Sequence, residues 1–271
     1  MLKIGARAHD YGKKAPRELF EHIRSDGYEG IQLAFKKAVA GIACRQDITP
    51  EVLEETRSAL KDTGLALPVL GTYVELAAAD ERQRAEAVEE FSAGIAFARE
   101  LKAGCIGTET TKMSSQPQIT QGEVILLLKR SLEVLLPQAE AAGVIVAVEP
   151  VWGHTLHTWQ DAVELLKDMR SENLQIIFDP VNLLDPADAG RQAPYFEKCF
   201  EALREHIVAV HMKGTRIADG QKQSVRFWDS ILDYETVFRL LRQMEGELFV
   251  LHEEADPATA DRAMKFLKPL L

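Results

Sequence analysis

Basic side chains are in short supply in this chain. Lysine and arginine total 32 against 42 aspartates and glutamates, which gives a formal net charge of −10 and a pI of about 5.3. Proteins that bind nucleic acid usually present a basic face, so this balance argues against a nucleic-acid partner. A strongly negative charge mainly favours solubility.

Cysteines and long apolar runs are also scarce. The cysteines are Cys44, Cys105 and Cys199, and their wide spacing without a C-x-x-C pair is typical of reduced thiols that serve as small hydrophobic side chains. No run approaches the roughly 18 apolar residues that cross a bilayer. The first residues lack the apolar centre of a signal peptide. We therefore expect a cytoplasmic protein with no membrane partner.

Glycine-rich nucleotide motifs are absent as well. The chain contains neither G-x-G-x-x-G nor G-x-x-x-x-G-K-[ST], which argues against Rossmann and P-loop folds. No linker rich in proline or glycine divides the chain, and 271 residues with 46% hydrophobic side chains suffice for one large core. We therefore expect residues 1–271 to form a single domain.

Strand-like and helix-like segments alternate from one end of the chain to the other. This alternation predicts βα units and a parallel sheet. Eight units in a chain of this length favour an α/β fold of the closed (β/α)8 TIM-barrel type over an open sheet. The predicted strands are residues 2–8, 29–35, 65–73, 103–109, 144–149, 174–179, 207–213 and 248–253. The longest irregular stretches, residues 113–118 and 213–233, follow strands and would lie at the active rim.

The last four predicted strands each end in an acidic or imidazole side chain, namely Glu149, Asp179, His211 and Glu253. Alternate residues of a strand face the same way, so each of the four can stand at the top of an inward-facing row. Three carboxylates and one imidazole suit Mn²⁺, Co²⁺, Mg²⁺ or Zn²⁺ and leave room for water or substrate. The alternative is isolated strand-end charges or helix N-caps, as for Asp179 before Pro180.

Two of these residues, Glu149 and Glu253, come from predicted strands on opposite sides of the site. A bound metal polarises a carbonyl and an adjacent hydroxyl, which acidifies the neighbouring C–H. One carboxylate can then remove that proton while the other holds or delivers one on the far face. The pair therefore indicates two-base proton transfer.

Further polar residues lie near the same rim. His154 and His157 follow Glu149 and could bind sugar hydroxyls, or pack against neighbouring tryptophans. Lys213 shares a strand face with His211 and could hold a carboxylate, phosphate or enolate oxygen. Glu109 ends the fourth predicted strand and is a further candidate for substrate binding.

The motifs VAVEP, IFDPVN, HMKG and LHEE, in this order and on these strands, resemble the sugar isomerase and epimerase superfamily with the xylose isomerase-like barrel. That group includes ketose 3-epimerases, hydroxypyruvate isomerase, inosose dehydratase and, more distantly, endonuclease IV. The resemblance is clearest from about residue 140 to the end. It implies that Glu149, Asp179, His211 and Glu253 bind one divalent metal ion, with the two glutamates as acid and base. Glu254 is an alternative to Glu253, but it falls on the other strand face.

The chain also departs from the ketose 3-epimerase pattern. Those enzymes carry a histidine where this chain has Asn182, which therefore stands at a substrate-binding position with a different side chain. They also have an arginine beyond the histidine of strand seven, for which Arg216 is the candidate.

The resemblance implies a divalent-metal-dependent isomerase or epimerase that acts on a small ketose, polyol or keto acid. The expected step is proton abstraction next to a carbonyl through a metal-stabilised enediolate, and a homo-oligomer is compatible with this class. A dehydratase that works by β-elimination is the main alternative. An endonuclease IV-like nuclease, which would need more histidine ligands and a basic groove, and a non-catalytic sugar-binding barrel are the others.

Overall fold

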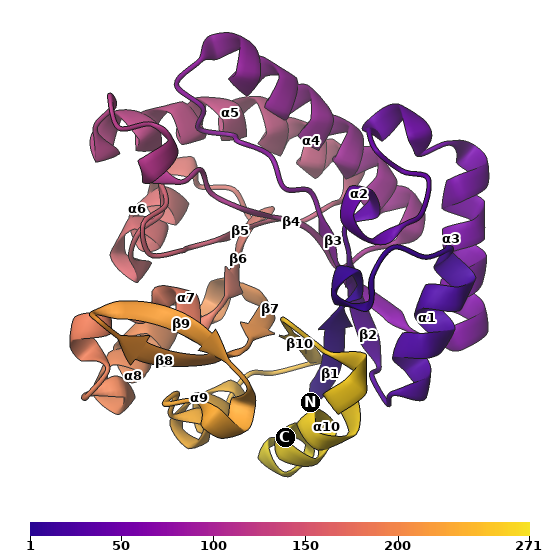
Figure 1. Ribbon diagram of the computed structural model, residues 1–271. Helices are drawn as coiled ribbons and strands as arrows, with labels where there is room; N and C mark the ends of the chain where they lie inside the picture. The colour runs from indigo at the N-terminus through magenta and orange to yellow at the C-terminus, as the bar shows by residue number, and fades with distance from the viewer.

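Eight parallel strands form a closed barrel at the centre of the computed structural model, which describes residues 1–271 (Figure 1). Each strand pairs with its neighbour in sequence, and the barrel closes where the first strand pairs with the last, with Leu2 opposite Leu248. The predicted (β/α)8 barrel is confirmed. Its strands are β1 (Leu2–Arg7), β2 (Gly30–Leu33), β3 (Ala66–Gly71), β4 (Cys105–Glu109), β5 (Val146–Glu149), β6 (Leu174–Phe178), β7 (Ile207–Met212) and β10 (Leu248–His252).

Helices surround the barrel as an outer ring (Figure 1). The longer ones are α1 (Pro16–Ser25), α3 (Pro50–Thr63), α4 (Glu81–Leu101), α5 (Gln121–Ala142), α6 (Trp159–Met169), α8 (Gln192–Leu203), α9 (Tyr234–Leu241) and α10 (Ala260–Leu267). Two single-turn helices, α2 (Phe35–Ala38) and α7 (Pro180–Leu183), lie beside strand ends. The 3-10 helices are η1 (Ala8–Tyr11), η2 (Arg45–Asp47), η3 (Met113–Ser115), η4 (Pro186–Asp188), η5 (Arg204–His206), η6 (Phe227–Asp229), η7 (Pro257–Thr259) and η8 (Lys268–Leu270).

Helix ends follow the local sequence. Thr120 and Glu123 form a reciprocal capping box that opens α5, and Thr158 and Asp161 do the same for α6. Helix α5 ends at Gly143, whose φ of 65° is a left-handed conformation that glycine adopts without steric cost. These short-range signals set where each helix turns back toward the next strand.

The hydrophobic core has two layers, and the inner one explains where the site lies. Most core side chains pack between strands and helices, whereas a smaller cluster fills the barrel interior. The interior side chains are Val69, Cys105, Ala147, Ile177, Ala209, Phe249 and Leu251. Residues two positions apart on a strand face the same side of the sheet. The residues two positions after Ala147, Ile177, Ala209 and Leu251 therefore also face the barrel interior. They are Glu149, Asp179, His211 and Glu253. The inward rows therefore end in polar side chains at the barrel mouth, the end where the strands have their carboxyl termini.

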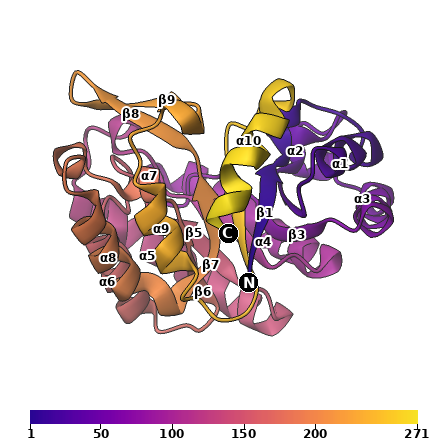
Figure 2. The same cartoon turned by 90° about the horizontal axis from the view of Figure 1, so that it is seen from below.

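The segment after β7 differs from the expected irregular loop. It forms an antiparallel hairpin of β8 (Gly214–Ala218) and β9 (Gln221–Val225). Asp219 and Gly220 make its turn with φ values of 52° and 72°, which matches the positive φ at both central positions of a type I′ turn. The hairpin stands at the mouth, at the opposite end of the barrel from the N-terminus (Figure 2).

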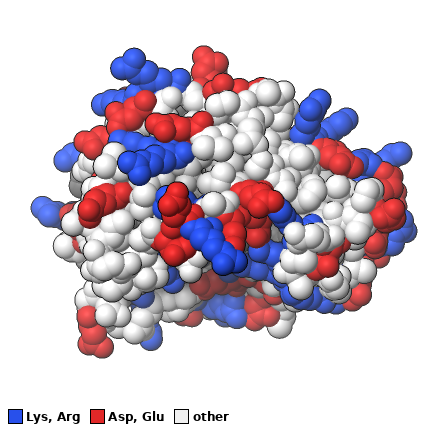
Figure 3. Space-filling view, turned by 90° about the horizontal axis from the view of Figure 1, so that it is seen from above, with Lys and Arg blue, Asp and Glu red and all other residues white.

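The outer surface gives two further observations. On the side shown in Figure 3, basic and acidic side chains are interspersed and do not gather into a basic stripe. None of the helices combines the length and the apolar character that a bilayer crossing requires.

Candidate metal centre and active site

Four side chains meet at the barrel mouth. Glu149, Asp179 and His211 each offer one ligand atom within 4.8 Å of the others. The fourth, Glu253, places Oε1 3.3 Å from Nδ1 of His211, and the same nitrogen lies 2.8 Å from Oε2 of Glu149. All four residues are at most 3% exposed. The structure thus brings together the four strand-end residues that the sequence singled out.

The donor set fits a divalent cation. Both ring nitrogens of His211 and Oδ2 of Asp179 are buried without a hydrogen bond of good geometry. Their neighbours are charged groups, because His211 lies close to two carboxylates and Oδ2 of Asp179 lies 2.9 Å from Nζ of Lys213. Buried carboxylates this close together require positive charge between them. Three carboxylates and one imidazole are hard and borderline ligands of the kind that Mn²⁺, Co²⁺, Mg²⁺ and Zn²⁺ accept.

His211 carries positive charge in the protein without metal. Burial lowers the pKa of its imidazole, but Glu149 and Glu253 outweigh burial and raise that pKa to about 9. An imidazole must be neutral to ligate a metal. A metal ion bound at this site would therefore replace a proton on His211.

Lys213 supplies a second cation beside the cluster. Its ammonium group lies 2.6 Å from Oε2 of Glu253 and 2.9 Å from Oδ2 of Asp179. Burial lowers the pKa of Lys213, but these two carboxylates outweigh burial and hold the pKa well above its ordinary value. A charged ammonium group thus lies next to the ligand atoms, where it can bind an anionic oxygen of a substrate.

Glu253 is held as an anion from several directions. Burial raises the pKa of this carboxyl, but Lys213, His211 and Arg7 outweigh burial and hold the pKa well below its usual range. The Arg7 guanidinium donates to Oε1 of Glu253 at 3.1 Å and also binds Asp10. Arg7 is the last inward-facing residue of β1. Its hydrogen bond therefore links the first barrel strand to Glu253, which follows the last barrel strand, β10.

Asn182 and Asp179 organise the other carboxylate. The side-chain amide of Asn182 donates to Oε1 of Glu149 at 2.5 Å. The Asn182 backbone N–H donates to Oδ1 of Asp179 at 2.9 Å, which caps α7. Asp179 therefore serves both alternatives raised by the sequence, because Oδ1 caps the helix and Oδ2 faces the cluster.

Of two further predicted substrate contacts, Glu109 lies beside the centre, whereas His154 follows β5 and forms a bridge with Lys112. Glu109 is the register partner of Glu149 across β4 and β5. His154 is 6% exposed, and its Nδ1 is buried without a partner. Both lie on the β4 and β5 side of the mouth.

The other two have partners within the protein. His157 accepts a hydrogen bond from the backbone N–H of Gly153 at 2.7 Å, and its ring lies against that of Trp152 with centroids 3.9 Å apart. Arg216 is exposed on β8 and donates to Gln223 of the same hairpin. The structure does not bring either side chain into the four-residue cluster.

Strands β1 to β3 also lead to polar side chains at the mouth. Arg7 and Gln32 are register partners. The Gln32 amide donates to the hydroxyl of Tyr73 at 2.7 Å, while its own Oε1 is buried without a partner. From the sequence Gln32 is assigned no role, because one glutamine in a short apolar strand carries no spacing signal.

Lys222 is the other residue that the sequence did not reveal. From β9 its ammonium group donates to the backbone carbonyls of Val181, Asn182 and Leu184 at 2.9, 3.0 and 3.1 Å. This lysine joins the hairpin to α7, the helix that carries Asn182. The contact spans about forty residues of chain, so no local motif announces it.

Comparisons with solved structures agree with this architecture. A 3-keto-D-glucoside 4-epimerase from E. coli has a TM-score of 0.75 at 19% identity, covering 99% of this chain and 100% of that one. D-psicose 3-epimerase from Clostridium cellulolyticum H10 has a TM-score of 0.75 at 15% identity, covering 99% of each chain. A probable 3-DHS dehydratase from Bacillus anthracis has a TM-score of 0.70 at 17% identity, covering 98% of each chain.

Identities this low establish a shared fold, and no curated protein matches the chain. The family comparison reaches further, because residues 20–270 match the family described as the xylose isomerase-like TIM barrel. That match covers nearly the whole barrel, including all four residues of the candidate metal centre. The chain belongs to the xylose isomerase-like TIM barrel family.

Proposed function

We propose that this protein is a divalent-metal-dependent isomerase or epimerase of a small ketose, polyol or keto acid. The observation that supports this most directly is the convergence of two glutamates, Glu149 and Glu253, on the same ring nitrogen of His211. Asp179 completes a ligand set that is buried from water. A structural charge cluster would need no such pair of carboxylates at a barrel mouth, where enzymes of this fold hold their active sites.

The four residues would hold the cation, and the chain's own groups would move the proton. When bound, a divalent cation supplies Lewis-acid polarisation of a substrate carbonyl and its neighbouring hydroxyl. Glu149 would remove the proton from the carbon next to the carbonyl. On the opposite face Glu253 would deliver a proton taken from the Lys213 ammonium group 2.6 Å away, after which water takes the proton from Glu149 and restores that of Lys213. Asn182 orients Glu149 by its hydrogen bond to Oε1, and Lys213 stabilises negative charge on a substrate oxygen.

A dehydratase is the second candidate. Both reactions begin by removing the same kind of proton, and they differ in whether a hydroxyl group on the next carbon then leaves. The similar solved structures include a probable dehydratase beside the two epimerases, which keeps β-elimination open for this scaffold. Product analysis separates the two, because elimination loses water and epimerisation does not.

The first test is metal content and proton exchange. Protein purified without chelator should contain about one equivalent of a divalent metal for one four-ligand site. In D2O, the metal-loaded protein should place deuterium on the carbon beside the carbonyl of at least one ketose or keto acid in a panel, followed by NMR. Glu149→Gln should abolish this exchange, while Glu133→Gln, on the exposed face of α5, should not.

Two results would count against the proposal. One is a protein that takes up no Mn²⁺, Co²⁺, Mg²⁺ or Zn²⁺ even when they are supplied in excess. The other is deuterium exchange that proceeds equally fast in Glu149→Gln. Either result would favour the alternative hypothesis that the protein is a non-catalytic sugar-binding barrel.

A further inference from the structure

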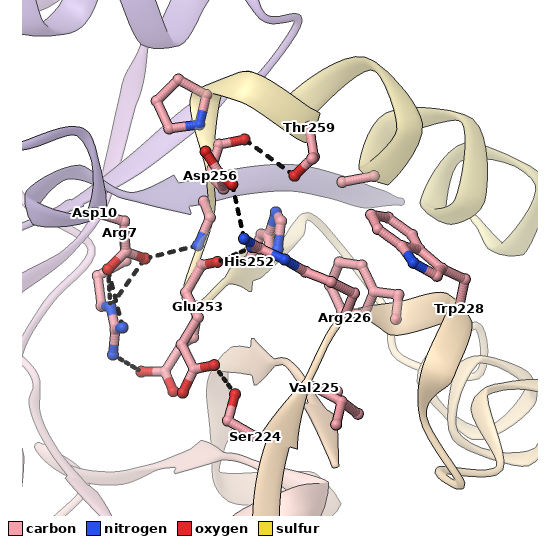
Figure 4. Close-up of a pocket in the computed structure, with 16 residues that line it drawn as sticks. Arg7, Asp10, Ser224, Val225, Arg226, Trp228, His252, Glu253, Asp256 and Thr259 are labelled. Atoms are coloured by element: carbon pink, nitrogen blue, oxygen red, sulfur yellow. Dashed lines mark hydrogen bonds and ion pairs between the residues drawn. The ribbon is translucent and has the colours of Figure 1, made fainter. Parts of the chain in front are cut away.

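A cavity of about 560 Å³ lies beside the metal centre, and the chemistry proposed above does not use it. Strand β9 and η6 form one side, and the segment from β10 to α10 forms the other (Figure 4). Glu253 and Arg7 line this cavity while also reaching the barrel mouth. A group attached to a substrate at the metal centre can therefore extend past Glu253 into this space.

The cavity contains a buried imidazole with a free nitrogen. His252 is 6% exposed, and its Nδ1 is hydrogen-bonded to the hydroxyl of Tyr28 at 2.7 Å. Its Nε2 has no partner in the protein, and the residue lines the cavity. One tautomer makes Nε2 a donor and the other an acceptor, and a ligand hydroxyl matches both.

Aromatic and small polar side chains complete the lining. The Trp228 ring carries the Arg262 guanidinium 3.8 Å from its centroid, and the Phe227 ring lies 4.5 Å from that of His252. Ser224 and other small polar groups lie on the same walls (Figure 4). Flat apolar surface combined with a few hydrogen-bonding groups suits a ligand with both apolar faces and hydroxyls, such as a sugar ring.

The charge of the lining excludes anionic groups. The guanidinium groups are already paired, Arg7 with Asp10 and Glu253, and Arg226 with Asp256. Carboxylates outnumber guanidinium groups in the lining, so a phosphate or carboxylate would meet excess negative charge. The charged lining residues are Arg7, Asp10, Arg226, Glu253, Glu254 and Asp256. A neutral, hydroxyl-rich group is favoured.

We propose that this cavity is a glycosyl subsite, so that the substrate is a neutral glycoside or similarly extended sugar and neither a free nor a phosphorylated monosaccharide. Ligand pockets commonly measure about 300–1,000 Å³, so the cavity is large enough for a sugar ring. This inference rests on the proposed function, because the subsite is defined relative to a substrate held at the metal centre.

The test compares binding of the metal-loaded protein to D-glucose, cellobiose, maltose, trehalose and glucose 6-phosphate by isothermal titration. At least one disaccharide should bind about tenfold or more tightly than D-glucose, as expected for added hydrogen bonds in a second subsite. Ser224→Phe, at an exposed position of β9 that lines the cavity, should fill the space and remove this preference. Gln223→Phe, also exposed on β9 but outside the lining, is the matched control and should keep it.

Equal affinity for glucose and every disaccharide would overturn the subsite, as would tighter binding of glucose 6-phosphate or a preference that survives Ser224→Phe. Metal content and deuterium exchange are measured independently of disaccharide affinity, so the proposed function can hold even if the subsite is wrong. Conversely, disaccharide binding that depends on Ser224 in a protein without metal-dependent proton exchange would show that the cavity binds sugar but would overturn the proposed function, and with it the cavity's role as a subsite of the metal centre.

Discussion

Asp179 shows at the scale of one residue how the site joins folding and chemistry. One carboxylate oxygen caps α7 and the other faces the ligand cluster. An asparagine keeps an oxygen that can cap the helix, but it removes the negative charge that a cation needs. The two functions of Asp179 can therefore be separated by a single substitution.

We expect Asp179→Asn to fold normally and to bind Mn²⁺ at least about 100-fold more weakly. Removing a residue that only hydrogen-bonds to a metal ligand already lowers metal affinity about 10–100-fold, and Asp179 is itself a proposed ligand. Titration calorimetry on chelator-treated protein measures this affinity. Asp185→Asn is the control, because Asp185 also caps a short helix but lies outside the cluster. Equal Mn²⁺ affinity in both variants would remove Asp179 from the ligand set.

His9 gives a prediction about pH. Burial, followed by Arg7 and Lys37, lowers the pKa of its imidazole from the ordinary 6.5 to about 3. Between pH 3 and pH 6.5, His9 binds a proton in the unfolded chain but stays neutral in the folded chain. The contribution of His9 to stability is therefore complete above pH 6.5 and declines as pH falls toward 3. In His9→Asn, the free energy of unfolding should therefore fall less steeply with acidification.

Urea denaturation of both proteins at neutral and mildly acidic pH measures this difference. The stability of His9→Asn relative to the unsubstituted protein should improve as pH falls, whatever its value at neutral pH. A stability difference that stays constant across this range would show that His9 titrates alike in the folded and unfolded chains.

At the scale of elements, the sequence predicted what depends on local periodicity. Alternating apolar residues located the barrel strands, and the inward phase placed Glu149 and Glu253 at the same end. The hairpin of β8 and β9 was missed because its strands are polar on both faces, although Asp219-Gly220 is a recognisable type I′ turn signal. The contacts of Lys222 join segments about forty residues apart, and no periodicity encodes them.

The hairpin's attachment to α7 gives a prediction at this scale. Lys222→Met retains the length of the side chain but removes three hydrogen bonds from a charged donor. Amide hydrogen exchange should accelerate in residues 214–225 and around α7, with the barrel strands unchanged. Lys198→Met, on the exposed face of α8, should leave all these rates unaltered. Unchanged exchange in the hairpin of Lys222→Met would mean that the ladder between β8 and β9 suffices to hold it.

At the scale of the whole molecule, the barrel depends on closure between its first and last strands. Gly5 of β1 lies in this seam opposite Leu251 of β10. A Cβ atom on Gly5 would meet Cδ2 of Leu251 at 2.6 Å and the backbone oxygen of Gly30 at 2.8 Å. The leucine side chain can turn aside, but the carbonyl of Gly30 belongs to the neighbouring strand and can move only with it. The seam therefore tolerates no side chain at this position.

We expect Gly5→Ala to reduce the free energy of unfolding by about 1–3 kcal/mol, the usual cost of overpacking a filled interior. Gly122→Ala in α5 adds the same methyl group where no atom lies within 4 Å, and alanine favours a helix, so this control should be neutral or slightly stabilising. Chemical denaturation measures both. Because Leu251 precedes Glu253 in the inward row of β10, Gly5→Ala should also weaken Mn²⁺ binding, whereas Gly122→Ala should not. Destabilisation without any change in Mn²⁺ affinity would show that the closing seam and the metal centre are mechanically independent.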